Sequence, residues 1–298
     1  MATIPAPILF VGAPRSGTTI TFEQFASHPD LAWVTNYAKA LPRVGAVNLV
    51  RRLVDNRFIS LIGQKNQFND AGWWNNYLPR PDESYPFWNA FACEGFDMGY
   101  LLGRDASTGE REALRSALEK VRRYQGRDRV TAKMTGPGRI QYLNSIWPDV
   151  YVVQVIRDGL GVVRSLLNVN FWKNRGGYEK PWWFGHDLED ELEVWRSEGS
   201  EPGALAALQW RHIIETSRRE ARELLGDRYI ELKYESFLED SVGGLRGLYE
   251  HVGLDPSHCD SIEALAARNK RYDDGWSDDY RESLIRWMEP VYSDLGYA

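Results

Sequence analysis

The segment Gly12-Ala-Pro-Arg-Ser-Gly-Thr-Thr19 has the residue types and the spacing of a phosphate-binding loop. It follows the apolar run from Ile8 to Val11, which predicts a buried strand. Glycines let the backbone curl, so that successive N–H groups at the start of the next helix point at one anion. A simple glycine turn before a helix would look similar, but the spacing and the strand–loop–helix context favour anion binding.

Thr18 stands where loops that bind nucleoside triphosphates carry a lysine. Without that lysine, and with no obvious strand-end aspartate to help hold Mg²⁺, a triphosphate would be poorly neutralised. A 5′-phosphate that carries a less charged sulfate needs less positive charge, and Arg15 supplies charge from within the loop. The loop therefore favours a sulfated mononucleotide over ATP.

A second polar pair follows the strongest strand pattern of the chain, Tyr151 to Ile156. Arg157 stands at the end of this strand, and Ser165 lies eight positions later on a helix expected from Gly159 to about Val169. A strand end fixes a guanidinium, and a hydroxyl two helical turns away can share a phosphate with it. Alone, Arg157 would be interpreted as part of a strand-end cap; together with the loop, it predicts a second phosphate site.

These two motifs resemble those of sulfotransferases that use 3′-phosphoadenosine 5′-phosphosulfate (PAPS), especially the Golgi tyrosylprotein type and its bacterial relatives. The resemblance implies an enzyme that moves a sulfuryl group from PAPS to a hydroxyl or amine and releases 3′,5′-ADP. It implies that Arg157 and Ser165 bind the 3′-phosphate. It also implies a 5′-phosphosulfate loop made of Arg15, Ser16, Gly17, Thr18 and Thr19.

Three further stretches match the same family. Thr131-Ala-Lys133 resembles its strand with a catalytic lysine, and Lys233-Tyr234-Glu235 resembles a segment whose tyrosine lies near the nucleotide. Asn269-Lys270-Arg271-Tyr272 resembles a loop that closes over the cofactor, so Tyr234, Lys270 and Arg271 are expected cofactor contacts. The similarity runs in patches from residue 8 to the terminal Leu295-Gly-Tyr297.

Sulfuryl transfer needs an in-line approach of the acceptor oxygen and stabilisation of charge on the equatorial and leaving oxygens. Lys133 is the candidate for these oxygens, although a strand-end surface lysine would fit the same pattern. Arg15 would stabilise the departing 5′-phosphate. The sequence has no cluster of metal ligands, and this mechanism requires no metal.

The expected general base departs from the family pattern. The tyrosylprotein type carries a Glu after the His-Pro that ends the loop helix, and the position counted from His28-Pro29 is Asn36, which cannot take a proton. Glu83 and His186 are the replacement candidates, because nearby aromatic rings can shift the pKa of either group. Each could equally be an ordinary surface or packing residue. Weaker alternatives are Glu94 and Asp97, while His28 and His212 are expected to be structural.

The elements that must position these residues alternate between strands and helices, which predicts an α/β fold: a P-loop-like three-layer sandwich with a central parallel sheet. The expected strands are Ile8–Gly12, Leu31–Thr35, Val130–Met134, Tyr151–Ile156 and Arg228–Lys233. Further helices are expected at Gly17–Ser27, at Glu110–Tyr124, from a first turn at Pro137, and at Ala204–Leu225. We expect one domain over 1–298, with a helical, aromatic-rich insertion at about 37–128 and a Trp-rich surface loop or lid at about 171–203.

The composition limits the kinds of partner and the location that can be expected for this protein. The chain has 298 residues, a net charge of −6 and 43% hydrophobic residues, which is typical of a globular protein and disfavours nucleic acid as a partner. Cys93 and Cys259 form neither a disulfide framework nor metal-ligand spacing, and no run resembles a signal peptide or a membrane span. A reducing cytoplasm is therefore the expected location.

The acceptor and the oligomeric state stay open at this level. The 12 Trp, clustered at Trp73-Trp74, Trp172 and Trp182-Trp183, could line an apolar or sugar-stacking pocket or simply pack the core. Lipid, glycan, phenol and small-metabolite acceptors all remain possible. The competing functions are a divergent P-loop kinase or NTPase, which Thr18 disfavours, and a non-catalytic nucleotide-binding protein of the same fold, to which Asn36 gives some support.

Overall fold

The central element of the fold is a parallel β-sheet. The computed structural model describes residues 5–56, 58–59, 61–63, 73–265 and 275–297. In this part of the chain the sheet has five parallel strands in the order β2-β3-β1-β4-β5. In that order the strands span Leu31–Ala32, Arg129–Thr135, Ile8–Gly12, Tyr151–Ile156 and Tyr229–Lys233. The predicted α/β class with a central parallel sheet is confirmed.

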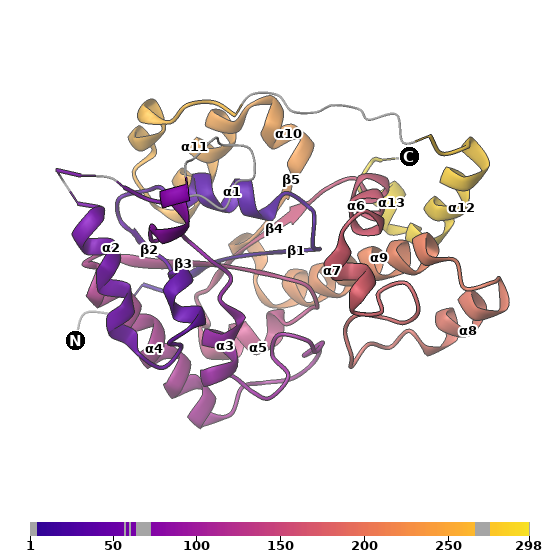
Figure 1. Ribbon diagram of the computed structural model, residues 1–298, viewed down its shortest axis with the longest axis horizontal. Coiled ribbons are helices and arrows are strands. Elements are labelled where there is room, and N and C mark those ends of the chain that lie inside the picture. The colour runs from indigo at the N-terminus through magenta and orange to yellow at the C-terminus, as the bar shows by residue number, and fades with distance from the viewer. Residues whose placement is uncertain (1–4, 57, 60, 64–72, 266–274, 298) are drawn as a thin grey trace.

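Helices cover both faces of the sheet, because alternate residues of each strand point to opposite sides. Ile8 and Phe10 of β1 pack with one layer of helices, whereas Leu9 and Val11 pack with the other. The first layer contains α1 (Thr18–Phe25), α10 (Tyr234–Glu239) and α11 (Ser241–Val252). The second contains α3 (Tyr85–Phe91), α4 (Thr108–Gln125) and α5 (Ile140–Ile146), on the opposite side of the strands (Figure 1).

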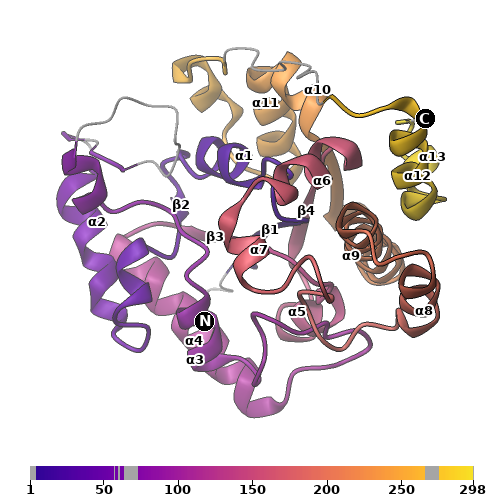
Figure 2. The same cartoon turned by 45° about the vertical axis from the view of Figure 1, so that its right-hand side comes forward.

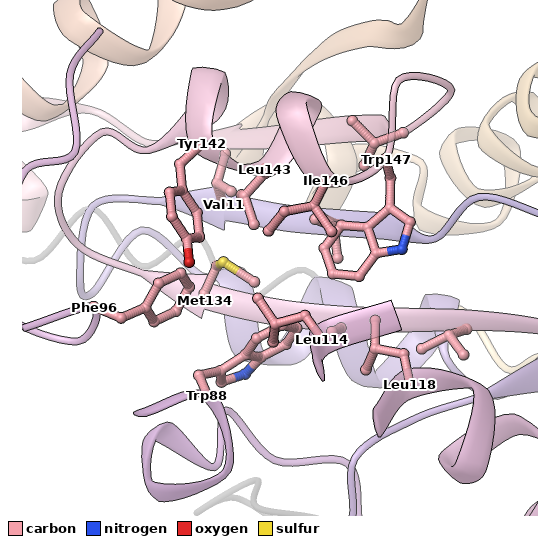
Figure 3. Packing of buried hydrophobic residues seen from close by; sticks show 14 of the residues in the cluster. Val11, Trp88, Phe96, Leu114, Leu118, Met134, Tyr142, Leu143, Ile146 and Trp147 are labelled. Atoms are coloured by element: carbon pink, nitrogen blue, oxygen red, sulfur yellow. The ribbon is translucent and has the colours of Figure 1, made fainter. Parts of the chain in front are cut away.

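The second layer holds a dense core in which Val11 and Met134 from the strands meet Leu114 and Leu118 of α4 and Leu143 of α5 (Figure 3). Leu114 and Leu143 are both fully buried. Burial of each such side chain contributes about 1.5–3 kcal/mol. The core therefore holds β1 and β3 rigidly at the edge where the loop begins.

A third group of helices packs together past the carboxyl end of β4, where Ile156 joins its core. It comprises α6 (Gly159–Leu167), α7 (Asn170–Asn174), α8 (Glu189–Ser197), α9 (Pro202–Leu224), α12 (Asp278–Met288) and α13 (Val291–Asp294). In Figure 2, α8, α9, α12 and α13 lie on the right, and α6 and α7 lie nearer the middle. None of the helices in the described residues is long and apolar enough to cross a membrane.

The segment at about 171–203, expected as a surface loop or lid, is partly helical. The segment contains most of α7 and all of α8, and the side chains of Trp172 and Trp183 are only 1% and 6% exposed. Trp172 stacks on Trp182 with ring centroids 4.8 Å apart. The aromatic rings fill space against α9 instead of lining a mobile surface, since large apolar area is stabilised most by burial.

The segment 37–128 is less helical than predicted. Before α4, its described residues form α2 (Leu49–Val54), α3 and the short 3₁₀ helices η1 (Asn36–Lys39), η2 (Gly45–Asn48) and η3 (Trp73–Tyr77). The predicted helix Glu110–Tyr124 is confirmed within α4, which begins with a capping box between Ser107 and Glu110. Two more 3₁₀ helices, η4 (Gly226–Arg228) and η5 (Pro256–Ser261), complete the described elements.

Two predicted boundaries are also wrong for identifiable reasons. Strand β2 ends at Ala32 and not at Thr35, because the amide and carbonyl of Trp33 pair with the side chain of Gln125, at 3.2 and 2.6 Å. Helix α5 begins at Ile140 and not near Pro137. The Glu220 carboxylate accepts hydrogen bonds from the backbone N–H groups of Ile140 and Gln141, which caps α5 at this point.

Arg51 ties the segment before α4 to the sheet, and its replacement should destabilise the fold. The guanidinium is buried, donates to the Leu31 carbonyl at 2.7 Å and to Gln125 Oε1 at 2.8 Å, and pairs with Asp55. We expect Arg51→Met to lower the free energy of unfolding by about 2–4 kcal/mol, because it leaves buried acceptors without a donor. Urea unfolding followed by circular dichroism measures this.

The matched control is Arg52→Met, which removes an exposed guanidinium from the adjacent position of α2. We expect it to change the free energy by less than about 0.5 kcal/mol. Equal unfolding midpoints for the two variants would contradict the anchoring role of Arg51.

Candidate active site

The sheet topology brings the predicted site residues to one edge. Strand β1 lies between β3 and β4. The strands β2 and β3 therefore follow on one side of β1, and β4 and β5 follow on its other side. In parallel sheets ligands bind beyond the carboxyl ends of the strands at such a switch point. The loop after β1, Arg157 after β4 and Tyr234 after β5 follow three of these ends, and Lys133 lies near the end of β3.

The loop between β1 and α1 has the curled backbone that its glycines predict. Gly12, Arg15 and Gly17 have φ angles of 154°, 71° and 80°. A Cβ on Gly17 would lie 2.2 Å from ring carbons of Tyr234, and one on Gly12 would lie 2.5 Å from the Val155 carbonyl oxygen. Arg15 holds a left-handed conformation that costs about 1–3 kcal/mol and persists mainly at functional sites.

The curl leaves donors for an anion. The N–H groups of the first turn of α1 have no acceptor within the helix. Ser16 is fully buried, and its Oγ has no hydrogen-bond partner within the described part of the chain. Buried hydroxyls normally have partners. The loop therefore fits an anionic ligand that brings oxygen acceptors, such as a phosphosulfate.

The second predicted phosphate site adjoins the loop. Arg15 Nε donates to Ser165 Oγ at 2.8 Å, and Arg157 Nη1 donates to the Arg15 carbonyl at 3.0 Å. Desolvation of the guanidinium, and then the positive charge of Arg157, lower the pKa of Arg15. Two like charges held this close are relieved by a bound anion.

The end of β4 is supported by the segment after β5 and by the C-terminal residues. Glu235 accepts from the Asp158 backbone N–H at 3.1 Å and from the Tyr297 hydroxyl at 2.9 Å. Asp158 in turn caps α6 and accepts from the Tyr292 hydroxyl at 3.1 Å. The Arg157 guanidinium lies 5.3 Å from the ring centroid of Tyr234. The matched stretches at 233–235 and 295–297 therefore brace the strand end that bears Arg157.

Lys133 is not a surface lysine. It is 3% exposed, its Nζ donates to Thr19 Oγ1 at 2.8 Å, and it lies 3.3 Å from Glu83 Oε1. The same Glu83 oxygen accepts from Thr135 Oγ1 at 2.7 Å. The structure thus joins a cation, a carboxylate and the phosphate loop in one group, which is the arrangement that charge stabilisation and proton removal require.

Asn36 explains why Glu83 reaches this group. The Asn36 backbone N–H donates to the Arg80 carbonyl at 3.1 Å, and its side-chain oxygen accepts from the Arg80 N–H at 3.0 Å. Thr35 pairs with Pro81 in an antiparallel bridge, and the Asp82 N–H donates to the Val34 carbonyl. These bonds align the segment that carries Glu83 against the extension of β2. The residue in the expected base position therefore holds the segment that brings another carboxylate.

The other candidates for the general base do not join the group formed by Lys133, Thr19 and Glu83. His186 Nδ1 is 3.8 Å from Glu189, and within the described residues no hydrogen bond or ion pair joins His186 to the loop, to Lys133 or to Glu83. Glu94 is exposed and Asp97 is half-buried. The expected contacts Lys270 and Arg271 lie outside the described residues.

The two histidines expected to be structural are both buried. His28 Nδ1 accepts from the Asp30 N–H at 3.2 Å, and its Nε2 lies 3.1 Å from the Asp255 carbonyl oxygen. His212 lies 3.2 Å from Asp187, and burial lowers its pKa to about 4. Both positions fit packing roles.

Sequence reasoning missed Thr135, Tyr85 and Arg139. Thr135 orients Glu83, while the Tyr85 hydroxyl donates to the Thr135 carbonyl. Arg139 is 1% exposed and lies 4.7 Å from the ring centroid of Phe96. Burial raises the pKa of Tyr85 and lowers that of Arg139. Thr135 lies two residues after Lys133, on the same face of β3. This spacing is the one sequence feature that could have indicated that Thr135 belongs to the site.

Within the described ranges, no group of three or more His, Cys, Asp or Glu is arranged to hold a metal ion. Cys93 and Cys259 are free and buried.

Comparison with known proteins agrees with this geometry. A family model described as the sulfotransferase family matches residues 7–258. Two curated relatives, both omega-hydroxy-beta-dihydromenaquinone-9 sulfotransferases, come from Mycobacterium bovis and Mycobacterium tuberculosis. Each is 25% identical over 273 residues, and the match covers 85% of this chain but 64% of the relative's length.

Two solved structures share the fold. Sulfotransferase STF9 from Mycobacterium avium superimposes with a TM-score of 0.56 at 16% identity, over 98% of this chain and 77% of that one. A sulfotransferase domain from the curacin biosynthetic pathway gives a TM-score of 0.52 at 12% identity, over 100% and 99% of the two chains. At these identities the likeness concerns the fold, and it agrees with the predicted P-loop-like sandwich.

Gly17→Ala tests the loop. The added methyl group would collide with Tyr234 and would have to adopt a left-handed φ, so we expect the variant to lose about 1–3 kcal/mol of stability. We also expect at least about tenfold weaker binding of 3′,5′-ADP by calorimetry, since the N–H groups no longer converge.

The control is Gly247→Ala on α11, where a Cβ meets nothing within 4 Å. That change should stabilise the protein by about 0.5–1 kcal/mol and leave ligand binding unchanged. Unaltered binding by Gly17→Ala would show that the curl does not form the anion site.

Proposed function

This chain belongs to the sulfotransferase family, and from that premise we propose that it moves a sulfuryl group from PAPS to a hydroxyl or amine acceptor and releases 3′,5′-ADP. The observation that carries the proposal is the contact group of Lys133, Thr19 and Glu83 at the mouth of the phosphate loop. The chain spans 64% of the length of its curated relatives, so their acceptor and partners are not transferred to it directly.

We propose that the loop and the neighbouring strand end hold the two ends of the donor nucleotide. The N–H groups of residues 16–19, the Ser16 hydroxyl and Arg15 would hold the 5′-phosphosulfate, and Arg157 with Ser165 would hold the 3′-phosphate. The positive charges of Arg15 and Arg157 repel each other, and an anion bound between them would relieve that repulsion. Tyr234 would support the nucleotide from its position against Gly17.

In the transfer step, the donor supplies an activated sulfuryl group whose bond to the 5′-phosphate breaks as the acceptor oxygen attacks sulfur. Lys133 would stabilise negative charge on the equatorial and bridging oxygens, and Arg15 would stabilise the released phosphate. Glu83 would take the proton from the acceptor hydroxyl. Thr135 positions Glu83 for this task through its 2.7 Å hydrogen bond. Of the two base candidates, this geometry favours Glu83 over His186.

The same geometry argues against the two alternative functions, a kinase or NTPase and a non-catalytic protein. A kinase or NTPase would need more neutralisation than a loop with Thr18 provides. A non-catalytic protein would not need a buried lysine 3.3 Å from a carboxylate beside the loop. We also propose that no metal takes part and that the protein works in the cytoplasm, where two free buried cysteines are ordinary.

For the acceptor, we propose a largely apolar molecule with a hydroxyl group. The curated relatives act, by their name, on an omega-hydroxylated dihydromenaquinone. The buried Trp172 and Trp183 pack the interior, which weakens the sugar-stacking alternative.

Glu83→Gln tests the general base. It keeps the shape of the side chain and the hydrogen bond from Thr135 but cannot accept a proton, so we expect kcat to fall about 100- to 10,000-fold. Binding of 3′,5′-ADP should change less than about threefold, because the side chain does not hold the nucleotide. The measurement is transfer from labelled PAPS to a pool of hydroxylated apolar acceptors.

Glu94→Gln, at an exposed glutamate of the same segment, is the matched control and should keep full activity. Lys133→Ala should also lose activity. If Glu83→Gln retained wild-type kcat while His186→Gln lost it, the base would be His186.

Arg157→Ala tests the 3′-phosphate site. We expect it to weaken 3′,5′-ADP by about 100-fold, since a charge-assisted hydrogen bond contributes about 1.5–3 kcal/mol, and to weaken 5′-AMP by less than about threefold. Calorimetric titration without Mg²⁺ measures both, and ATP should compete poorly. Equal loss for the two ligands would place the 3′-phosphate elsewhere.

A further inference from the structure

The exposed apolar side chains of this protein gather in one segment. Of the twelve large apolar residues that are exposed in the described part of the chain, nine lie between Leu41 and Tyr77. We call these nine the apolar patch: Leu41, Val44, Leu49, Leu53, Phe58, Ile59, Leu61, Trp74 and Tyr77. Single exposed apolar residues are ordinary, but a cluster marks a surface that contacts something apolar.

The exposure follows from how the segment is anchored. On α2, the polar Arg51 faces the interior, where it bonds to Leu31 and Gln125, while Leu53 is 73% exposed. Asn48 is also buried and accepts from the Thr35 N–H. Arg51 and Asn48 thus point inward while Leu49 and Leu53 point outward, which is the reverse of the usual pattern of a surface helix. The buried hydrogen bonds of Arg51 and Asn48 hold this orientation.

The two arms of the segment lie side by side. The Leu61 N–H donates to the Val54 carbonyl at 2.8 Å, and the Gly63 N–H donates to the Pro79 carbonyl at 2.9 Å. The Tyr37 hydroxyl donates to the Tyr77 carbonyl. The patch residues on α2, on the following turn and on η3 therefore belong to one connected surface region, at the end of the molecule marked by α2 in Figure 1.

The charge of the segment is opposite to that of the protein. Its described residues contain Lys39, Arg43, Arg51 and Arg52 against Asp55, a net charge of +3 in a chain whose net charge is −6. Arg43 and Arg52 are exposed among the apolar residues, and the half-exposed Lys39 pairs with Asp82 at 3.0 Å. Asp55, the acidic residue of the segment that the structure describes, is paired with Arg51 and Arg127. The patch therefore presents apolar side chains within a cationic border.

We propose that the apolar patch docks peripherally onto an anionic lipid bilayer. Apolar side chains can enter the boundary between headgroups and acyl chains, Trp and Tyr prefer that depth, and Lys and Arg attract anionic headgroups. A second copy of this chain is a poorer occupant, because its patch carries the same positive charge. A bilayer satisfies both the apolar and the cationic parts of the surface.

The position of the patch suggests that membrane docking would deliver the acceptor to the site, and this step rests on the proposed function. The segment begins at Asn36 and ends at Arg80, which pair with each other, and Glu83 follows three residues later. A bilayer bound at the patch would lie against the segment whose end presents the proposed base. An apolar acceptor dissolved in the membrane would then be delivered from the side of the Lys133–Glu83 pair.

The test is co-sedimentation of the full chain with vesicles, without any transfer reaction. Wild type should bind vesicles of phosphatidylcholine mixed with phosphatidylglycerol, more weakly those of phosphatidylcholine alone, and less at high salt. Leu41→Ser/Leu53→Ser should reduce partitioning at least about tenfold, because it removes two apolar side chains from the contact. Arg43→Glu/Arg52→Glu should abolish the preference for the anionic vesicles.

Val194→Ser is the matched control, since Val194 on α8 is 49% exposed and lies outside the patch; its binding should equal that of wild type. Circular dichroism and 3′,5′-ADP calorimetry confirm that each variant is folded. Failure of wild type to bind, or equal binding by Leu41→Ser/Leu53→Ser, would overturn the proposal. So would a concentration-dependent dimer that this variant abolishes. Transfer to a water-soluble acceptor reports on the proposed function separately.

Discussion

The curled backbone after β1 is the constraint on which the rest of this site depends. Gly12 passes close to Val155, and Gly17 passes close to Tyr234, so a side chain at either position would collide with a neighbouring element. That packing places Arg15 beside Arg157 and Ser165 and turns Thr19 towards Lys133. The like charges and the buried hydroxyl of Ser16 are unfavourable in isolation. Their persistence in a rigid sheet edge supports the anion site that we propose there.

The carboxylate of the proposed site, Glu83, comes from another segment than the one that the family resemblance indicates. Asn36 stands at the position where the resemblance to the tyrosylprotein type implies a Glu, yet its amide holds the backbone of Arg80 and so aligns the segment that carries Glu83. The charge lies in the same group of contacts but comes from another part of the chain. Proton transfer depends on where the carboxylate oxygen lies and not on which backbone carries it.

The apolar residues divide according to what the sheet can bury. The tryptophans Trp172 and Trp183 pack with residues of α9, whereas Leu49 and Leu53 of α2 are turned outward because Arg51 occupies the interior side. The same physical preference for burial thus has two outcomes. In one region the protein buries the rings itself, and in the other it leaves an apolar, cationic surface beside the segment that leads to Glu83.

Local patterns in the sequence determined the strands β1, β3, β4 and β5, the helix α4, the curled loop after β1, and the positions of Arg157 at a strand end and Ser165 on the next helix. These features depend on residues close together in the chain, where hydrophobic periodicity and glycine spacing act directly. Only the tertiary structure decided the short β2, the start of α5, the burial of the Trp-rich segment and the meeting of Glu83 with Lys133. Each of these depends on a partner far along the chain, such as Gln125 for Trp33 or Glu220 for Ile140. Contacts of this kind leave no periodic trace in one sequence, because their energy comes from pairing across the fold.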